Sequence, residues 1–450
     1  MPSATVAEQR PQKGLFERIL SPIADVRRDE TVSVLLLTLM MFLMLSGYYM
    51  LKTAREVFIL SQGGAEVKSY ASAGQAILLL FIVPAYGAFA SRVSRIQLVS
   101  WVPLFFASNI VLFGLAWGAG LNVGVPFFLW LGIFNVMVIA QFWGFANDVY
   151  TPEQGKRLFP LIGLGSSLGA WLGSIRAGVV MQSAGPGRLL TGGAVLLVAC
   201  VGLARLVDRQ ARRNAPPARA AKADERLGGG QSGFSMLLTN RYLMLIAVLT
   251  LLLNVVNTTG EYLFGRYIVQ SATAMYGAGA AAEEARGRFI GDAYSSFFSN
   301  VNLLGLLLQM FVVSAVFRLL GVGRALFIHP FIAGAGYLMM LRTPSFDTMR
   351  LLKTADNAVD YSIGNTTKQA LWLPTSREAK YKAKQAVDSF FQRAGDVLQA
   401  GIVYSGELTA LSIGGFAALN IIFVAGWLGV AGGLNRRLRA RAGSSGGNEW

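Results

Sequence analysis

Polar and charged side chains recur at helical spacing inside long apolar runs of this sequence. Asn257 and Glu261 are four residues apart, and so are Asp356 and Asp360, which places each pair on one face of a helix. Such stripes suit the binding of a polar solute or of a proton. No HExxH, GxSxG or paired-cysteine motif accompanies them, so we expect neither catalysis nor a metal or cofactor site.

The first apolar run carries a basic cluster, in which Lys52 and Arg55 lie beside Glu56. A charge inside a membrane-spanning helix costs about 2.5–3.5 kcal/mol on insertion scales, so these side chains must face an aqueous cavity or a partner. The stripes favour a solvated central cavity. For the pairs Lys52–Glu56 and Asp388–Arg393, salt bridges that only hold the helices together are an equal alternative.

The expected cavity has mixed charge with a cluster of cations on the first helix, which suits an anionic or zwitterionic organic solute. Arginine can clamp a phosphate or carboxylate through two hydrogen bonds, whereas lysine acts as a point charge. The candidate substrate-binding residues are Tyr49, Lys52, Arg55, Asn135, Asn257, Glu261, Arg266, Lys353, Asp356 and Asp360. The candidates for proton coupling are the carboxylates Glu56, Glu261 and Asp360, because a midmembrane carboxylate can hold a proton.

Three glycines, Gly165, Gly169 and Gly173, recur every four residues. This spacing lets two helix backbones approach closely, so we expect a packing role. The further candidates for gating or structural roles are charged residues, namely Lys156, Arg157, Lys384, Asp388 and Arg393.

The chain has a single cysteine, Cys200, and a single histidine, His329, and both lie in apolar segments. We expect Cys200 to be a buried, inert thiol, because no second cysteine is present to form a disulfide or a metal site. His329 is interpreted as a packed core side chain, with an intramembrane proton relay as the alternative.

The composition indicates a polytopic all-α membrane protein. Of its 450 residues 54% are hydrophobic and only 14% are charged, whereas a soluble domain has roughly 25% charged residues. The net charge of +16 comes from short segments between apolar runs, which is typical of cytoplasmic loops and not of a nucleic-acid surface. The twelve predicted spans are 32–58, 70–91, 97–119, 123–147, 158–182, 189–207, 242–270, 291–318, 322–341, 345–372, 385–408 and 411–433.

The spans predict two six-helix bundles in the major-facilitator arrangement, with a solute site between them. The predicted divisions are a cytoplasmic segment 1–31, bundles 32–207 and 241–433, a basic linker 208–240 and a cytoplasmic tail 434–450. Most basic loop residues fall on one side, so both termini are expected in the cytoplasm of a bacterium, with the chain in its inner membrane. Lys68 is assigned to the loops of the opposite side. We expect a monomer whose partners are the lipid bilayer and a small solute.

Several segments resemble the ATP/ADP translocases of plastids and intracellular bacteria, a branch of the major facilitator superfamily. The resemblance rests on Phe142-Trp143-Gly144-Phe145-Ala146-Asn147 with the run 156–165, on Lys368, Pro374 and the runs 380–388 and 393–395, and on 49–57. It implies transport of nucleotides or related phosphorylated anions, often by exchange. The family's essential lysine late in the first helix corresponds to Arg55.

The resemblance also has departures at key charges. The family's acidic residue in the fourth helix falls near Leu131, its glutamate in the seventh near Asn257, and its lysine in the tenth near Asp360. The resemblance therefore implies a relative with an altered substrate and not strict ATP/ADP exchange.

We accordingly predict a secondary active transporter working by alternating access, with Lys52, Arg55 and Arg266 gripping an anionic solute. Two alternatives stay open. One is a proton-coupled transporter of a lipid, amphiphile or zwitterion, and the other is a non-transporting membrane receptor or assembly protein on the same fold.

Overall fold

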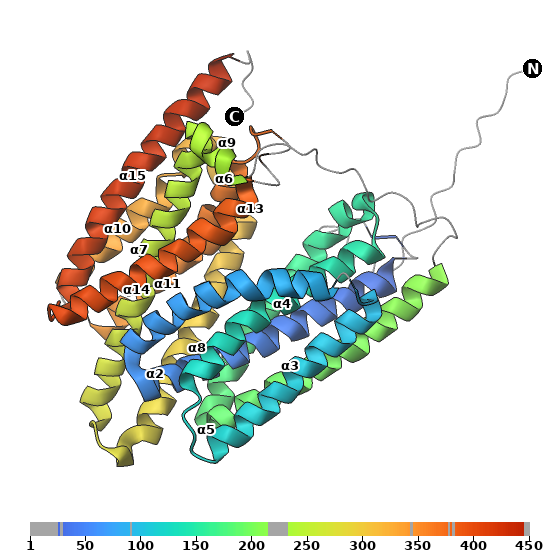
Figure 1. Cartoon of the computed structure of the whole chain (residues 1–450), viewed down its shortest axis with the longest axis horizontal. Coiled ribbons are helices and arrows are strands. Elements are labelled where there is room, and N and C mark those ends of the chain that lie inside the picture. The colour runs from blue at the N-terminus through green and yellow to red at the C-terminus, as the bar shows by residue number, and fades with distance from the viewer. Residues whose placement is uncertain are drawn as a thin grey trace, which may run out of the picture.

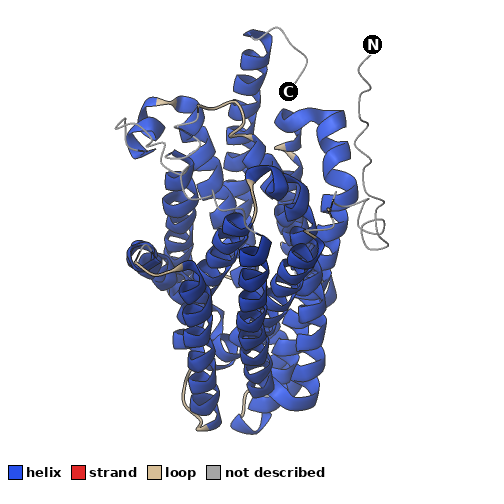
Figure 2. Cartoon of the chain, turned by 90° about the vertical axis from the view of Figure 1, so that its right-hand side faces the viewer, coloured by secondary structure: helices blue, strands red, loops and turns tan. Residues whose placement is uncertain are grey.

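The computed structural model describes residues 26–27, 30–90, 92–214, 233–342, 345–376, 379 and 383–444. Within these ranges the chain is helical and contains no strand, joined by short loops (Figure 2). The all-α fold class is confirmed. The predicted N-terminal segment lies almost wholly outside the described residues, as does most of the predicted linker.

The first part of the chain, residues 30–214, is called the N-half. Its helices are α2 (Thr31–Ala90), α3 (Arg95–Gly118), α4 (Gly124–Val149) and α5 (Pro152–Asn214). α2 and α5 each consist of two helical segments joined at a glycine, Gly64 and Gly185, both with φ of 74°. A residue with a Cβ rarely adopts this left-handed backbone conformation, so glycine is required at both breaks.

The second part, residues 233–444, is called the C-half. Its helices are α6 (Gly233–Thr239), α7 (Arg241–Tyr276), η1 (Ala280–Ala282), α8 (Glu283–Leu307), η2 (Leu308–Val312), α9 (Val313–Ala325), α10 (Ile328–Met340), α11 (Phe346–Val359), η3 (Asp360–Gly364), α12 (Asn365–Ala370), α13 (Lys384–Ala386), η5 (Val387–Phe391), α14 (Gln392–Leu408) and α15 (Ile413–Ser444). The segments η2, η3 and η5 are π-helical, a form that often marks functional sites.

Seven helices within the described ranges are long and apolar enough to cross a membrane. Three of them, Thr31–Tyr86, Arg157–Gln210 and Ala280–Ala325, have 56, 54 and 46 residues, where one crossing needs about 20. The number of twelve spans stays a prediction. α5 runs to Asn214 and α15 to Ser444, so helix extends into the predicted linker and into the predicted C-terminal tail.

The two halves pack against each other along α2 and α5 of the N-half and α7, α8 and α14 of the C-half. Figure 1 shows the halves converging near the middle of α2 and spreading apart toward the end where α2 begins and α15 finishes. We call the converging end the Gly64 end and the other the Thr31 end.

The glycines of α5 bring its backbone against the first segment of α2. A Cβ built on Gly165 would lie 2.7 Å from the carbonyl oxygen of Thr38, and one on Gly169 or Gly173 would collide with the backbone of Phe42 or Ser46. The Ser46 hydroxyl donates a hydrogen bond to the Gly169 carbonyl oxygen at 3.0 Å. The close helix approach predicted from the spacing is present in the fold.

Candidate functional site

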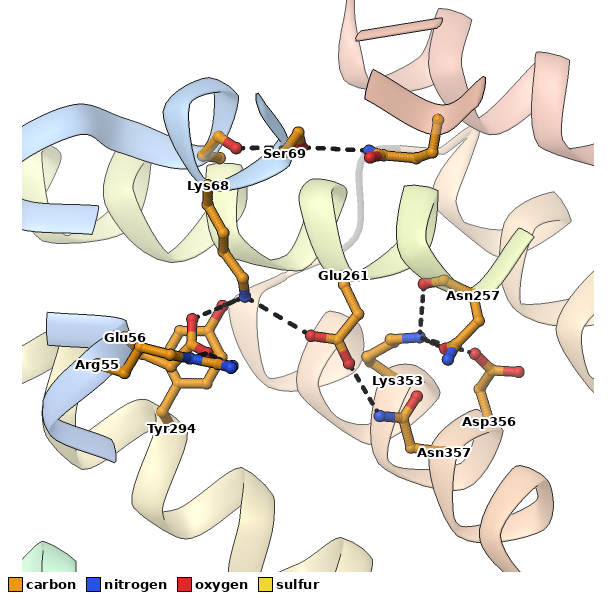
Figure 3. Close-up of polar contacts among 12 residues, drawn as sticks. Arg55, Glu56, Lys68, Ser69, Asn257, Glu261, Tyr294, Lys353, Asp356 and Asn357 are labelled. Carbon is orange, nitrogen blue, oxygen red and sulfur yellow. Dashed lines mark hydrogen bonds and ion pairs between the residues drawn. The ribbon is translucent and has the colours of Figure 1, made fainter. Parts of the chain in front are cut away.

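A chain of buried charges crosses the boundary between the halves (Figure 3). Lys68 of α2 lies 2.7 Å from a carboxylate oxygen of Glu56, also in α2, and 3.6 Å from one of Glu261 in α7. Its Nζ also donates to the Tyr294 hydroxyl of α8 at 3.3 Å. One ammonium group thus joins carboxylates of both halves.

The break at Gly64 brings Lys68 to this position. Glu56 and Lys68 are twelve residues apart, which in a straight helix would separate them by about 18 Å. Because the chain folds back at Gly64, the two side chains form an ion pair instead. The assignment of Lys68 to an external loop was therefore wrong, and Lys68 is a buried residue of the central site.

The predicted pair of Lys52 with Glu56 is also wrong. Glu56 is fully buried and pairs with Arg55 and Lys68. Lys52 Nζ lies over the Phe298 ring of the C-half, 4.2 Å from its centroid, and 5.3 Å from the centroid of Tyr49. Within the described part of the chain no carboxylate oxygen lies within 4.0 Å of Lys52, so its charge faces aromatic rings at the boundary of the halves.

The second part of the network lies inside the C-half. Lys353 is 1% exposed, and its Nζ donates to the Asn257 Oδ1 at 2.7 Å and lies 3.0 Å from a carboxylate oxygen of Asp356. Asn357 donates to Glu261 at 3.1 Å. The stripe on α7 and the stripe on α11 thus face each other, as Figure 3 shows.

His329 of α10 extends this network. Its Nε2 lies 3.2 Å from an oxygen of Asp356, and its Nδ1 lies 3.7 Å from an oxygen of Asp360. Its ring also packs edge-on against Trp427 of α15, with 4.8 Å between centroids. His329 is therefore both packed in the core and paired with two carboxylates, so the interpretation as packing alone was incomplete.

The charges divide unequally between the halves. To this network the N-half contributes three cations, Lys52, Arg55 and Lys68, and one carboxylate, Glu56, whereas the C-half contributes three carboxylates, Glu261, Asp356 and Asp360, and one cation, Lys353. With His329 neutral, the N-half side is net positive and the C-half side net negative. The halves therefore attract each other in this conformation.

Arg266 lies outside this network. It pairs with Glu407 of α14 at 2.8 Å and donates to the Tyr262 hydroxyl at 2.9 Å. Arg266 is five residues beyond Glu261, about 7.5 Å further along α7, which places it toward the Gly64 end. The expectation that it joins Lys52 and Arg55 was wrong. The Tyr262 hydroxyl also contacts Glu66 of the N-half at 3.5 Å, so this cluster is a second polar contact between the halves.

A cavity of ≈ 240 Å³ lies between α7, η3, α12 and α14. Its polar lining residues include Asn254, Asn257, Asp360, Asn365, Lys368 and Gln392. Amide groups that both donate and accept hydrogen bonds, together with one cation, suit a polar organic solute.

The remaining predicted residues are dispersed. Asn135 Oδ1 of α4 is buried, and no described residue forms a hydrogen bond with it. The side chain of Lys156 lies outside the described residues. Lys384 lies 3.7 Å from Asp388, and Arg393 lies 3.4 Å from Asp396. The suggested pair of Asp388 with Arg393 was therefore wrong, because each charge has a closer partner three or four residues away on its own helix.

Arg157 forms an ion pair of 2.7 Å with Glu30, the residue directly before α2. Burial raises the pKa of Glu30, but the hydrogen bonds from Arg157 and Gln154 lower it by more than burial raises it. The pKa of Glu30 therefore lies below its usual value. This contact ties the first segments of α2 and α5 together at the Thr31 end.

Sequence reasoning missed Lys68 and Glu407 as members of the polar clusters, whereas Asn357 lies on the polar face expected for 353–360. The pair Gly63-Gly64, followed closely by Glu66 and Lys68, was the available signal for a tight break with charges on the returning helix.

Comparisons with known proteins agree with this architecture. A family model described as TLC ATP/ADP transporter matches residues 128–270. ADP,ATP carrier protein 1 of Chlamydia trachomatis serovar D is 23% identical over 357 residues, which cover 67% of this chain and 62% of that relative. The chain thus spans less than two thirds of the length of this carrier. The similarity to the ATP/ADP translocases is confirmed, and their description as carriers supports the expectation that the chain is no enzyme.

Solved structures share the fold. The nucleoside transporter NupG aligns with a TM-score of 0.62 at 14% identity, covering 89% of this chain and 98% of that structure. A bacterial homologue of the iron transporter ferroportin in an inward-facing state aligns with a TM-score of 0.61 at 14% identity, covering 88% and 98%. The fold is that of major-facilitator transporters.

Proposed function

We propose that this protein is a secondary active transporter that carries a nucleotide-like or other phosphorylated organic anion by alternating access. The observation that carries the proposal is Lys68, which Glu56 of the N-half and Glu261 of the C-half share at the boundary between them. Burying such a set of charges is costly, and ionisable side chains inside membrane-spanning helices mark functional sites.

An anionic solute can replace Glu261 as the partner of the N-half cations. Lys52 lies at the same boundary without a carboxylate partner in the described structure, and Lys68 is shared. A phosphate or carboxylate placed between them would neutralise Lys52 and compete with Glu261 for Lys68. The solute thereby weakens the attraction between the halves, which is the differential interaction that a conformational change requires.

The positions of the other contacts indicate which end opens. Contacts between the halves include Ser69 with Gln399, Ser174 with Asn302, and Gln182 with Asp292, all from the middle of the helices toward the Gly64 end. With the termini in the cytoplasm of a bacterial inner membrane, as the basic loops predict, this conformation is open to the cytoplasm and closed on the other side.

Strict ATP/ADP exchange is not part of the proposal. Leu131, at the place of the family's acidic residue, is fully buried in α4, and Asn257 and Asp360 are engaged with Lys353 and His329. A nucleotide-like anion is supported by the matched family model and by the amide-rich cavity beside the network.

The test is anion binding to the purified full chain in detergent, measured by thermal shift and with radiolabelled ADP. The panel holds ADP, ATP, a nucleoside monophosphate, a sugar phosphate, an amino acid and a phospholipid, because only a true ligand stabilises the fold. We expect at least one phosphorylated anion to raise the unfolding temperature. Stabilisation by the phospholipid or amino acid alone, or by none of the panel, would refute an anion site.

Lys52→Ala should weaken binding of the stabilising anion by about 10-fold or more, because a hydrogen bond to a charged group contributes about 1.5–3 kcal/mol. Lys52→Arg should retain most of the affinity. Arg288→Ala is the matched control, since Arg288 is an exposed cation paired with Glu284 on α8. Equal affinity of Lys52→Ala and Arg288→Ala would contradict the role of Lys52.

A further inference from the structure

We propose that His329 is the proton-binding site that couples proton movement to the opening of the two halves. This inference rests on the proposed transport function and adds its coupling ion. It rests on the position of His329, which lies between two carboxylates, beside a cavity and close to the ion pairs that join the halves.

The imidazole of His329 has one engaged and one unengaged nitrogen. Nε2 lies at hydrogen-bond distance from Asp356, at 3.2 Å. Nδ1 is buried and has no hydrogen-bond partner among the residues that the structure describes, and the nearest oxygen of Asp360 is 3.7 Å away. A neutral imidazole that donates from Nε2 to Asp356 therefore presents a free lone pair on Nδ1 toward Asp360.

The charges around His329 favour uptake of one proton. Asp356 and Asp360 face the ring from α11 and η3, and Lys353 is the cation paired with Asp356. Among the groups joined at 4.0 Å or less, two carboxylates and one ammonium leave one negative charge in excess when His329 is neutral, and a proton on the imidazole cancels it. α15 contributes the uncharged Trp427.

One further cation lies near the cluster. Lys368 of α12 lines a small cavity together with His329 and Trp427, next to Leu249 and Leu253 of α7. Within the described contacts Lys368 forms no ion pair with Asp356 or Asp360 inside 4.0 Å, so its charge acts on Asp360 only from a greater distance. It also lines the larger cavity, where a bound anion would take up its charge.

Protons reach His329 through Asp360. Asp360 lines the cavity of ≈ 240 Å³ and opens the π-helical segment η3, which ends at Gly364. A Cβ on Gly364 would lie 2.9 Å from the His329 Nδ1. Glycine at this position therefore leaves the space that the imidazole ring occupies against η3. In the transfer step the O–H bond of a protonated Asp360 breaks, a new N–H bond forms at Nδ1, and the carboxylate and imidazolium remain as a pair.

Protonation of His329 changes the contact between the halves through Lys353. An imidazolium compensates Asp356, so Asp356 holds Lys353 less strongly. Lys353 lies next to Asn257 on α7, one turn from Glu261, and once released it can neutralise Glu261. Glu261 then attracts Lys68 of the N-half less. Protonation of His329 therefore loosens the contact between the halves and favours opening at the Gly64 end.

The first test uses the fact that His329 is the only histidine in the sequence. The full chain, carrying a purification tag without histidine, is labelled with ¹⁵N-histidine and its imidazole signals are followed by NMR. We expect one imidazole titration while the chain stays folded. In Asp360→Asn the midpoint should move to lower pH, because a carboxylate facing the imidazolium is lost. Asp347→Asn, an exposed aspartate of α11 paired with Arg350, is the matched control and should leave the midpoint unchanged.

The second test measures the distance across the Gly64 end. Spin labels are placed at two exposed positions, Asn122 of the N-half and Thr409 of the C-half, after each is changed to cysteine in a Cys200→Ala background. The population with the longer distance should grow as pH falls, with the midpoint of the histidine titration. In His329→Gln this population should no longer depend on pH. If His329→Gln does not fold, Asp360→Asn is used instead, and the midpoint of its distance change should move together with the midpoint of its histidine titration.

The outcomes separate this inference from the proposed function. An imidazole signal that does not titrate while the chain stays folded overturns the proton site. A distance whose pH dependence is the same in the natural chain and in His329→Gln overturns the coupling. Both tests need no solute, so failure of every anion in the binding panel would remove the proposed substrate and leave the proton-driven opening to stand on its own data.

Discussion

Glu56→Gln removes the carboxylate that two cations of the central site share. Glu56 is fully buried, and Lys68 lies 2.7 Å from it. At an effective dielectric constant of about 20 the direct attraction of this pair is about 6 kcal/mol, against about 5 kcal/mol for the remaining contact of Lys68 with Glu261 at 3.6 Å. Since the substitution leaves the buried Lys68 and the half-buried Arg55 with too few partners, we expect a net loss of about 3–5 kcal/mol.

The assay is thermal unfolding of the purified chain in detergent. With an unfolding entropy of about 2.1 cal/mol/K per residue, each kcal/mol moves the transition of a chain of this length by about 1 °C, so a fall of at least about 3 °C is expected. Glu284→Gln makes the same change in an exposed pair with Arg288, where the Glu284 side chain is 80% exposed. It should cost about 0–1 kcal/mol.

A double variant sharpens this prediction. Lys68→Met in the Glu56→Gln background removes one of the uncompensated cations and should recover part of the lost stability. The reasoning fails if Glu56→Gln unfolds at the same temperature as Glu284→Gln, or if Lys68→Met only adds to the loss.

Two further predictions concern the packing of α5 against α2. Gly165→Ala should destabilise the protein by about 1–3 kcal/mol and lower its unfolding temperature, because the added Cβ would lie 2.7 Å from the Thr38 carbonyl oxygen. The control is Gly163→Ala, two residues earlier on the same helix, where no described atom lies within 4 Å of the added Cβ. Equal effects of the two substitutions would contradict the close approach. Glu30→Gln should destabilise the protein at pH 7 and lose this effect in acid, because folding lowers the pKa of Glu30. The stabilisation by Glu30 is present above its unfolded pKa of 4.5 and is lost as the pH falls through its folded pKa. The difference in unfolding temperature between the variant and the natural chain is measured at pH 7 and pH 4, and it would be the same at both if the ion pair with Arg157 contributed nothing.

The fold class followed from the sequence because membrane insertion depends on local apolar length. The long runs that carry α2, α5, α7 and α15 are readable residue by residue, and so is the spacing of the three glycines that seat α5 on α2. The division into twelve spans is harder, since α2 and α5 continue as helix on both sides of a single glycine.

The candidate site was predictable in part. The stripes on α7 and α11 do face each other, through Asn257 and Lys353, because helical spacing alone decides which side chains share a face. Partners were not predictable. Lys52 and Glu56 have ideal spacing for a pair, yet Glu56 pairs with Lys68, because a neighbour on another helix segment offered a shorter contact.

By itself the sequence determined that charged side chains are buried at membrane depth in an all-helical chain, because hydropathy and helical period are properties of each segment alone. Only the tertiary structure decided which charges meet. The fold-back at Gly64 placed Lys68 between Glu56 and Glu261, and the rise along α7 carried Arg266 away to Glu407. Coulomb attraction depends on distance in space, and distance in space between helices is set by how they turn and pack.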